Sequence, residues 1–197
     1  MREVAEPVSE VARLAGGTLW LAASGAWFSP DGATVSSVGL NGCGAVDSDG
    51  AVAVLLCSES AEAQPTRWWP FPAATGALWL YDGERTWAVP RVGALTVAPQ
   101  VDHGLVAWLA YPETVDGCTG TGTGQVWVAP VARPGGYVTV GTVGLGCYCC
   151  DSLWPEVALS LHQGLMAWNY APVDGAPTVR EGRAGGLGWA KAALRCD

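Results

Sequence analysis

Two segments of the chain repeat one another, and this internal similarity constrains the fold more than any other feature. Residues 104–117 read GLVAWLAYPETVDG and residues 164–175 read GLMAWNYAPVDG, with Gly, Leu, Ala and Trp at identical offsets. Fainter versions of the same opening begin at Gly16 and Gly50. A chain that repeats one short unit is predicted to build its core by packing copies of that unit against each other.

A second element recurs between these openings. Residues 75–83 (TGALWLYDG) and 123–131 (TGQVWVAPV) both place Thr-Gly before an alternating segment, and a Val-rich segment follows each. Alternation of this kind is typical of strands, and 27 Gly and 13 Pro favour short strands with frequent turns over long helices. We predict a unit of three strands whose recurring tryptophans lie in the core: Trp20, Trp79, Trp108, Trp127 and Trp168.

The length of 197 residues favours one domain built from such units. The openings are unequally spaced, which disfavours a solenoid of equal rungs. The approximate units are 10–43, 44–97, 98–153 and 154–197. Residues 4–14 are compatible with a short helical turn or with an extended arm.

The sequence also resembles a known class of repeats. Trp27-Phe28-Ser29-Pro30-Asp31-Gly32 resembles the F-S-P-D-G turn of WD-type and TolB-like β-propeller repeats. Residues 101–108 (VDHGLVAW) and 125–128 (QVWV) are similar to the first and second strands of TolB-like blades. The resemblance implies an all-β fold, a small or incomplete β-propeller of about four irregular repeats. Because a single S-P-D-G is present and short strands with regular turns also suit a β-sandwich, the sandwich is the alternative.

Three cysteines, Cys147, Cys149 and Cys150, lie within four positions in the segment GCYCCDSLWP. This spacing does not supply the two paired knuckles of a structural zinc site, and the chain has two histidines, His103 and His162. A redox centre would need Cys-x-x-Cys at the start of a helix, whereas the surrounding sequence predicts strands. We therefore expect no metal and no cofactor.

Structural disulfides are the favoured role for the cysteines, with buried thiols as the alternative. Cys43 and Cys57 flank one repeat opening with room for a hairpin between them, so they are the predicted local pair. Six cysteines pair in about 15 ways, so the sequence does not give the full connectivity. The candidates are Cys43, Cys57, Cys118, Cys147, Cys149, Cys150 and Cys196. We interpret the Cys147–Cys150 cluster as a staple between the third and fourth units.

An aromatic group lies at RWWPFP, residues 67–72. Aromatic side chains held by prolines can stack on sugars or anchor a protein partner, and the alternative is a loop that folds back over the core. The candidate binding residues are Arg67, Trp68, Trp69 and Phe71.

Acidic turns supply a further possible site. Asp47-Ser48-Asp49-Gly50 resembles the start of a calcium loop, but no glutamate follows at the distance that such a loop needs. A plain Asx turn is the favoured interpretation, as it is for Asp82-Gly83-Glu84.

No catalytic residues are predicted, because the chain lacks a nucleophile elbow, a His-Glu-x-x-His segment and a phosphate-binding loop. The net charge of −8 disfavours binding to nucleic acid, and no apolar run is long enough to span a bilayer. The first residues, MREVAEPVSEVARL, carry three Glu and do not resemble a signal peptide.

These features predict a non-enzymatic structural or binding module, stabilised by disulfides, in an extracellular or virion setting. We expect a protein partner or self-association through edge strands or loops. The alternatives are a glycan-binding module that uses Trp68 and Trp69, and a propeller-type hydrolase based on carboxylates. The sequence does not identify the partner.

Overall fold

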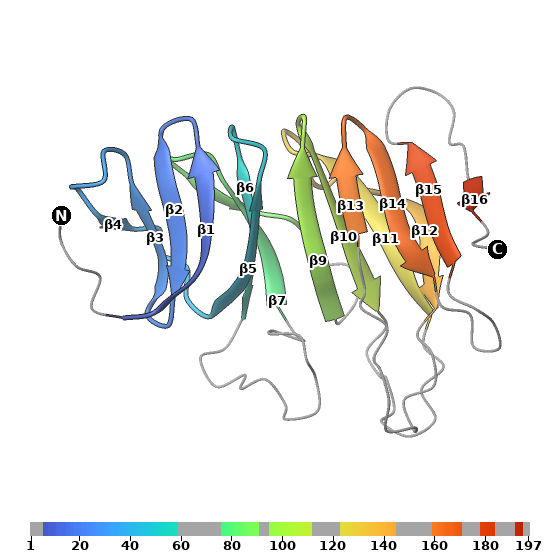
Figure 1. Cartoon of the computed structure of the whole chain (residues 1–197), viewed down its shortest axis with the longest axis horizontal. Helices are drawn as coiled ribbons and strands as arrows, with labels where there is room; N and C mark the ends of the chain where they lie inside the picture. Colours follow the sequence, from blue (N-terminus) through green and yellow to red (C-terminus); the bar gives the residue numbers. More distant parts are fainter. Residues whose placement is uncertain are drawn as a thin grey trace, which may run out of the picture. The chain divides into compact units, whose positions relative to one another are not determined.

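The described part of the chain consists of β-strands and connections (Figure 1). The computed structural model describes residues 6–58, 76–90, 95–111, 123–144, 159–170, 178–183 and 192–194. Its strands form four antiparallel sheets of four strands each. The all-β class predicted from the sequence is therefore confirmed. The chain divides into two compact units, Met1–Arg91 and Val92–Asp197, which are described separately.

The first unit contains two sheets whose strands follow one another in sequence order. For residues 4–14, the sequence is compatible with either a helical turn or an extended arm. Val8–Leu14 of this segment form a strand, in which the buried side chains of Ala12 and Leu14 alternate with exposed ones. The first sheet comprises β1 (Val8–Leu14), β2 (Gly17–Ala22), β3 (Gly25–Ser29) and β4 (Ser36–Ser37). The second sheet comprises β5 (Cys43–Ser48), β6 (Ala53–Ser58), β7 (Gly76–Tyr81) and β8 (Thr86–Ala88).

The second unit has the same plan of two consecutive four-stranded meanders. The prediction of three strands to a unit was wrong, because each sheet gains a fourth strand. The third sheet comprises β9 (Leu95–Asp102), β10 (Leu105–Tyr111), β11 (Thr123–Pro130) and β12 (Val138–Gly144). The fourth sheet comprises β13 (Leu159–His162), β14 (Leu165–Tyr170), β15 (Thr178–Arg183) and β16 (Ala192–Leu194).

The GLVAW and GLMAW repeats encode the first hairpin of the third and fourth sheets. Positive φ angles occur at both turn residues, 48° and 75° at His103-Gly104 and 49° and 74° at Gln163-Gly164. This is the two-residue turn whose twist matches that of the flanking strands, and glycine adopts its second position without strain. In the strand that follows each turn, a tryptophan lies four residues after the turn glycine. These are Trp108 in β10 and Trp168 in β14, which are 1% and 2% exposed.

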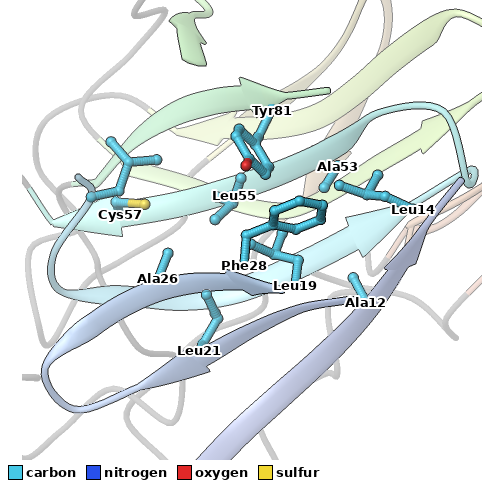
Figure 2. Packing of buried hydrophobic residues seen from close by; sticks show 11 residues of the cluster. Ala12, Leu14, Leu19, Leu21, Ala26, Phe28, Ala53, Leu55, Cys57 and Tyr81 are labelled. Carbon is cyan, nitrogen blue, oxygen red and sulfur yellow. The ribbon is translucent and has the colours of Figure 1, made fainter. Parts of the chain in front are cut away.

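Side chains from both sheets of the first unit form one core (Figure 2). Leu19 and Leu21 of β2 belong to the same cluster as Leu55 of β6. Phe28 meets Tyr81 edge to face, with ring centroids 5.4 Å apart. The cluster consists of Ala12, Leu14, Leu19, Leu21, Ala26, Phe28, Leu40, Ala53, Leu55, Cys57 and Tyr81.

The faint repeat opening at Gly50 is one residue out of register. Val54 follows Gly50 by four residues, as Trp108 follows Gly104 and Trp168 follows Gly164. The side chain of β6 that packs against the preceding sheet is nevertheless that of Leu55. The cause is a wider turn, in which the N–H of Asp49 donates to the carbonyl of Val52. A shift of one residue in a strand moves every side chain to the opposite face.

A disulfide joins Cys43 and Cys57, which are paired in register on β5 and β6. The predicted local pair is therefore confirmed. Cys57 is buried in the core of the first unit, and Cys43 packs against that core.

The recurring tryptophans all lie in strands but differ in burial. Trp20, Trp108 and Trp168 are buried, whereas Trp79 and Trp127 are half-buried, so the prediction that all five lie fully in the core was too broad. The assignment of residues 125–128 to a second strand was also wrong. GLVAW itself contributes the second strand, which leaves QVWV in the third strand, β11.

In the second unit, a glycine lets the fourth sheet pack closely on the third. The indole of Trp168 in β14 covers Gly141 in β12, and a Cβ placed on Gly141 would lie 2.3 Å from Trp168 Cζ2. Trp168 Nε1 also donates to the carbonyl oxygen of Thr142 at 3.2 Å. The two sheets are thus joined by an aromatic ring that needs bare backbone beneath it.

Replacing Gly141 with alanine is expected to lower the unfolding free energy by about 1–3 kcal/mol, because the added methyl group overlaps the Trp168 ring. Urea denaturation followed by tryptophan fluorescence measures the loss. Thr139→Ala on the same strand is the matched control, since Thr139 is exposed. Equal stability of the Gly141→Ala and Thr139→Ala variants would contradict the close packing.

Candidate functional site

The outer strand of the third sheet, β12, is the strongest candidate for a binding surface. The strand order β12-β11-β10-β9 puts β12 at an edge, and no described strand pairs with its other side. It spans seven residues, VTVGTVG, without a charge or a proline. Val138 is 43% exposed and Thr139 is exposed as well. Such an edge presents unpaired N–H and C=O groups to another chain.

Each sheet of the first unit has one outer strand much shorter than β12. β4 has two residues and β8 has three. Short outer strands are one way in which proteins prevent edge pairing. The long outer strands β1, β5 and β9 differ from β12 in another way, because each contains a charged residue, and β9 also contains a proline. Among the long outer strands of these three sheets, β12 is therefore the one without a charge or a proline.

Aromatic side chains fix the start of β12. Tyr137 directly precedes the strand, and its ring lies 5.2 Å from that of Trp127 and 6.4 Å from that of Trp108, both edge to face. Trp127 is in register with Thr139. The N–H of Gly136 donates to the carbonyl of Arg133, which closes the connection from β11. The start of β12 is therefore held in place by aromatic contacts to β10 and β11.

The two ends of β12 differ in availability. An extra residue at Val140 forms a bulge against β11, since Val126 pairs with Gly141 and Trp127 pairs with Thr139. Beyond the bulge, the Thr142 carbonyl already accepts a hydrogen bond from Trp168 Nε1. The end available to a new strand is therefore Val138–Gly141.

A second candidate is a group of titratable side chains at two hairpin turns of the second unit. His103 Nδ1 lies 2.8 Å from Asp102 Oδ1, and His162 Nδ1 lies 4.0 Å from Asp102 Oδ2. The N–H of Gln163 donates to Asp102 Oδ2. One carboxylate thus connects the turn after β9 to the turn after β13.

The charge state of Asp102 follows from these contacts. Desolvation raises the pKa of its carboxyl group, but the hydrogen bonds from the Gln163 N–H and from His103 outweigh it and lower the pKa below the ordinary value. Both histidine side chains are largely exposed. Across the ranges that the structure describes, no group of three or more His, Cys, Asp or Glu is arranged to hold a metal ion.

Other acidic side chains shape turns. Asp49 Oδ1 accepts hydrogen bonds from the N–H groups of Ala51 and Val52, so the calcium-like segment contains the Asx turn that the sequence favoured. Asp82 Oδ1 accepts two in the same way, from Glu84 and Arg85.

The F-S-P-D-G segment forms a similar turn. Asp31 Oδ1 accepts hydrogen bonds from Ala33 and Thr34, and Ser29 Oγ accepts one from Gly32. The hydrogen bonds that the Asp31 carboxylate accepts lower its pKa, with the one from the Thr34 N–H having the largest effect and the one from Ala33 the next. The segment therefore has a structural role.

Most of the site residues predicted from the sequence lie outside the described residues. These are the aromatic group Arg67, Trp68, Trp69 and Phe71, and the cysteines Cys118, Cys147, Cys149, Cys150 and Cys196. The glycan-binding hypothesis and the staple at Cys147–Cys150 therefore stay predictions. No membrane-spanning helix occurs in the described ranges.

Sequence reasoning missed β12 as a site, although a signal for it is present. GYVTVGTVG stands out as a β-branched segment without charge or proline, which is the composition of an unprotected edge. Whether this segment lies at the edge of a sheet depends on the order of the strands, and the residues of the segment do not determine that order.

Comparison with known proteins gives a distant structural resemblance. No family model and no curated protein sequence matches the chain. Among solved structures, the chain is similar to TolB from Acinetobacter baumannii, with 11% identity and a TM-score of 0.38. The match covers 90% of this chain and 52% of that one, so the chain spans about half the length of that protein.

The Asp102 contact predicts an acid-sensitive connection between the two turns. Because the folded-state pKa of Asp102 lies below the unfolded value of about 3.9, its stabilisation is present above that pH and is lost as the pH falls through the folded-state pKa. Asp102→Asn should therefore be less stable than wild type at pH 7, with the difference shrinking below about pH 4.

Urea midpoints measured at several pH values test this prediction. Glu84→Gln is the control, since Glu84 is exposed and lies in a turn of the first unit. A difference between Asp102→Asn and wild type that is independent of pH would argue against the charged contact.

Proposed function

We propose that this chain is a non-enzymatic binding module that recognises an extended segment of a protein partner at the β12 edge. Its four meander sheets are the blades of a small or incomplete β-propeller. The observation that supports the proposal is the long, uncharged and open edge of β12. Proteins commonly capture extended segments by adding a strand to such an edge.

The binding mode follows from the geometry of the edge. A partner strand would form main-chain hydrogen bonds along Val138–Gly141, which supply affinity without a required sequence. Specificity would come from alternate side chains of the partner that contact Val138 and Thr139. Tyr137, held between Trp108 and Trp127, would limit how far the partner strand extends.

Electrostatics restrict the partner further. The β12 strand carries no charge, so it adds neither ionic attraction nor ionic repulsion to its hydrogen bonds with a partner. The whole chain has a net charge of −8, which favours approach of a neutral or basic segment over an acidic one.

The proposed setting is extracellular or virion-associated. The support is the Cys43–Cys57 disulfide, because such bonds persist in oxidising compartments and are rare in reducing ones. The disulfide holds β5 to β6 next to the core of the first unit.

Val138→Lys should weaken strand addition, because a lysine on an edge strand opposes pairing with another chain. The test is selection of short extended peptides on the wild-type protein from a displayed library, followed by amide hydrogen exchange of the complex. Bound peptides should slow exchange of alternate amides in Val138–Gly141, and the Val138→Lys variant should bind them at least about tenfold more weakly.

Ala132→Lys is the matched control, since it adds the same charge at an exposed turn position before β12. It should bind the selected peptides as wild type does. Peptides that protect other strands, or that bind the Val138→Lys variant equally well, would show that β12 is not the recognition edge.

A further inference from the structure

The connection from the first sheet to the second contains the one Asn-Gly pair of the sequence, Asn41-Gly42. Both residues are exposed, and Gly42 has a φ of 60°. Because Gly42 has no side chain, nothing of its own shields its backbone nitrogen. Within the described ranges, no hydrogen bond engages the side-chain amide of Asn41 or the N–H of Gly42. An amide carbon and a backbone nitrogen that can react with each other are therefore adjacent and unprotected.

The residues on either side of this pair are anchored. The N–H of Ala26 in β3 donates to the carbonyl of Leu40 at 2.9 Å, and the side chain of Leu40 is buried in the core of the first unit. Cys43 is bonded to Cys57 and paired with it in register. Asn41 and Gly42 alone therefore connect a residue held by the first sheet to a residue held by the second.

We propose that Asn41 is a site of spontaneous deamidation in the folded protein and that the isoaspartate formed there weakens the anchoring of Leu40. In the first step the Gly42 N–H loses its proton to hydroxide, and the nitrogen forms a bond to Cγ of Asn41. The side-chain nitrogen leaves as ammonia, which closes a succinimide ring. Water then breaks one of the two C–N bonds of this ring and gives either aspartate or isoaspartate. The overall reaction consumes one water, releases one ammonia and needs no oxidant or reductant.

Isoaspartate alters both the backbone and the charge of the connection. Its main chain runs through Cγ, so the backbone between Leu40 and Cys43 gains one methylene group. The disulfide keeps Cys43 in place, so the extra length acts on the Ala26–Leu40 hydrogen bond and on the buried Leu40 side chain. The new carboxylate also makes the net charge of −8 more negative. We therefore expect the modified protein to be less stable than the original one.

The other asparagine of the chain is an internal control. Asn169 lies in β14, in register with Val179 of β15, and Tyr170 follows it. A paired strand restricts the backbone rotation that the attack needs, and the tyrosine side chain hinders approach to the attacking nitrogen. Asn169 should therefore react much more slowly than Asn41.

Peptide mapping by mass spectrometry tests the modification in folded protein that is aged at mildly alkaline pH. The peptide that contains Asn41 should convert to aspartate and isoaspartate at least about tenfold faster than the peptide that contains Asn169 converts. Digestion at acidic pH avoids conversion during preparation, and enzymatic methylation of isoaspartate identifies that product. Conversion of Asn41 no faster than that of Asn169 would overturn the proposal.

Low concentrations of urea show which state reacts. Conversion from the folded state should keep its rate at urea concentrations well below the unfolding midpoint. A rate that rises with urea in proportion to the unfolded fraction would mean that the fold protects Asn41, and the proposal would be wrong.

Urea midpoints of aged and fresh protein test the structural consequence. Aged wild-type protein should unfold at a lower urea concentration than fresh protein. Aged Asn41→Gln should match its fresh form, because the longer side chain keeps the amide but closes a ring far more slowly. Freshly prepared Asn41→Asp adds the charge without the methylene group and should be more stable than the isoaspartate form. Converted wild-type protein with an unchanged midpoint would contradict the weakened anchoring of Leu40.

Discussion

Face-to-face packing between neighbouring four-stranded sheets is the interaction on which the rest of this structure depends. A sheet of four short strands is stable only when at least one face is covered. In the first unit the cover is a shared core of leucine, alanine and aromatic side chains. In the second unit it includes the Trp168 ring on Gly141. In the second unit the repeats GLVAW and GLMAW contribute to this packing, because they put a buried tryptophan at the same position of β10 and β14.

The same packing determines which surfaces are left for binding. The inner strands pair on both sides, so backbone hydrogen-bonding groups become available at the outer strands. Of these, β12 combines length, β-branched residues and a lack of charge. The packing that stabilises the sheets thus also leaves the edge at which we propose recognition.

The sequence predicted what local chemistry controls. The hairpins at Gly104 and Gly164 follow from turns that require positive φ, and the Cys43–Cys57 pair follows from its place on either side of a hairpin. The one-residue slip at Val54 was not predictable from the repeat alone. It depends on the width of the turn at Asp49, which changes the face on which every later side chain of β6 lies.

Properties that depend on position within a sheet were also beyond the sequence. Trp108 and Trp127 have similar local sequences, but one is buried in a second strand and the other is half-buried in a third. Asp102 and Gln163 are 61 residues apart, and the packing of two hairpins brings them together. The edge status of β12 is likewise a result of strand order, which no local pattern contains.

Amide hydrogen exchange of the free protein, resolved by residue, tests the central claim that β12 is an open edge. The account predicts that alternate amides of Val138–Gly141 exchange roughly a hundredfold or more faster than those of the central strand β10, because they have no partner strand. If every amide of β12 were as well protected as those of β10, the edge would already be paired, and recognition by strand addition there would be contradicted.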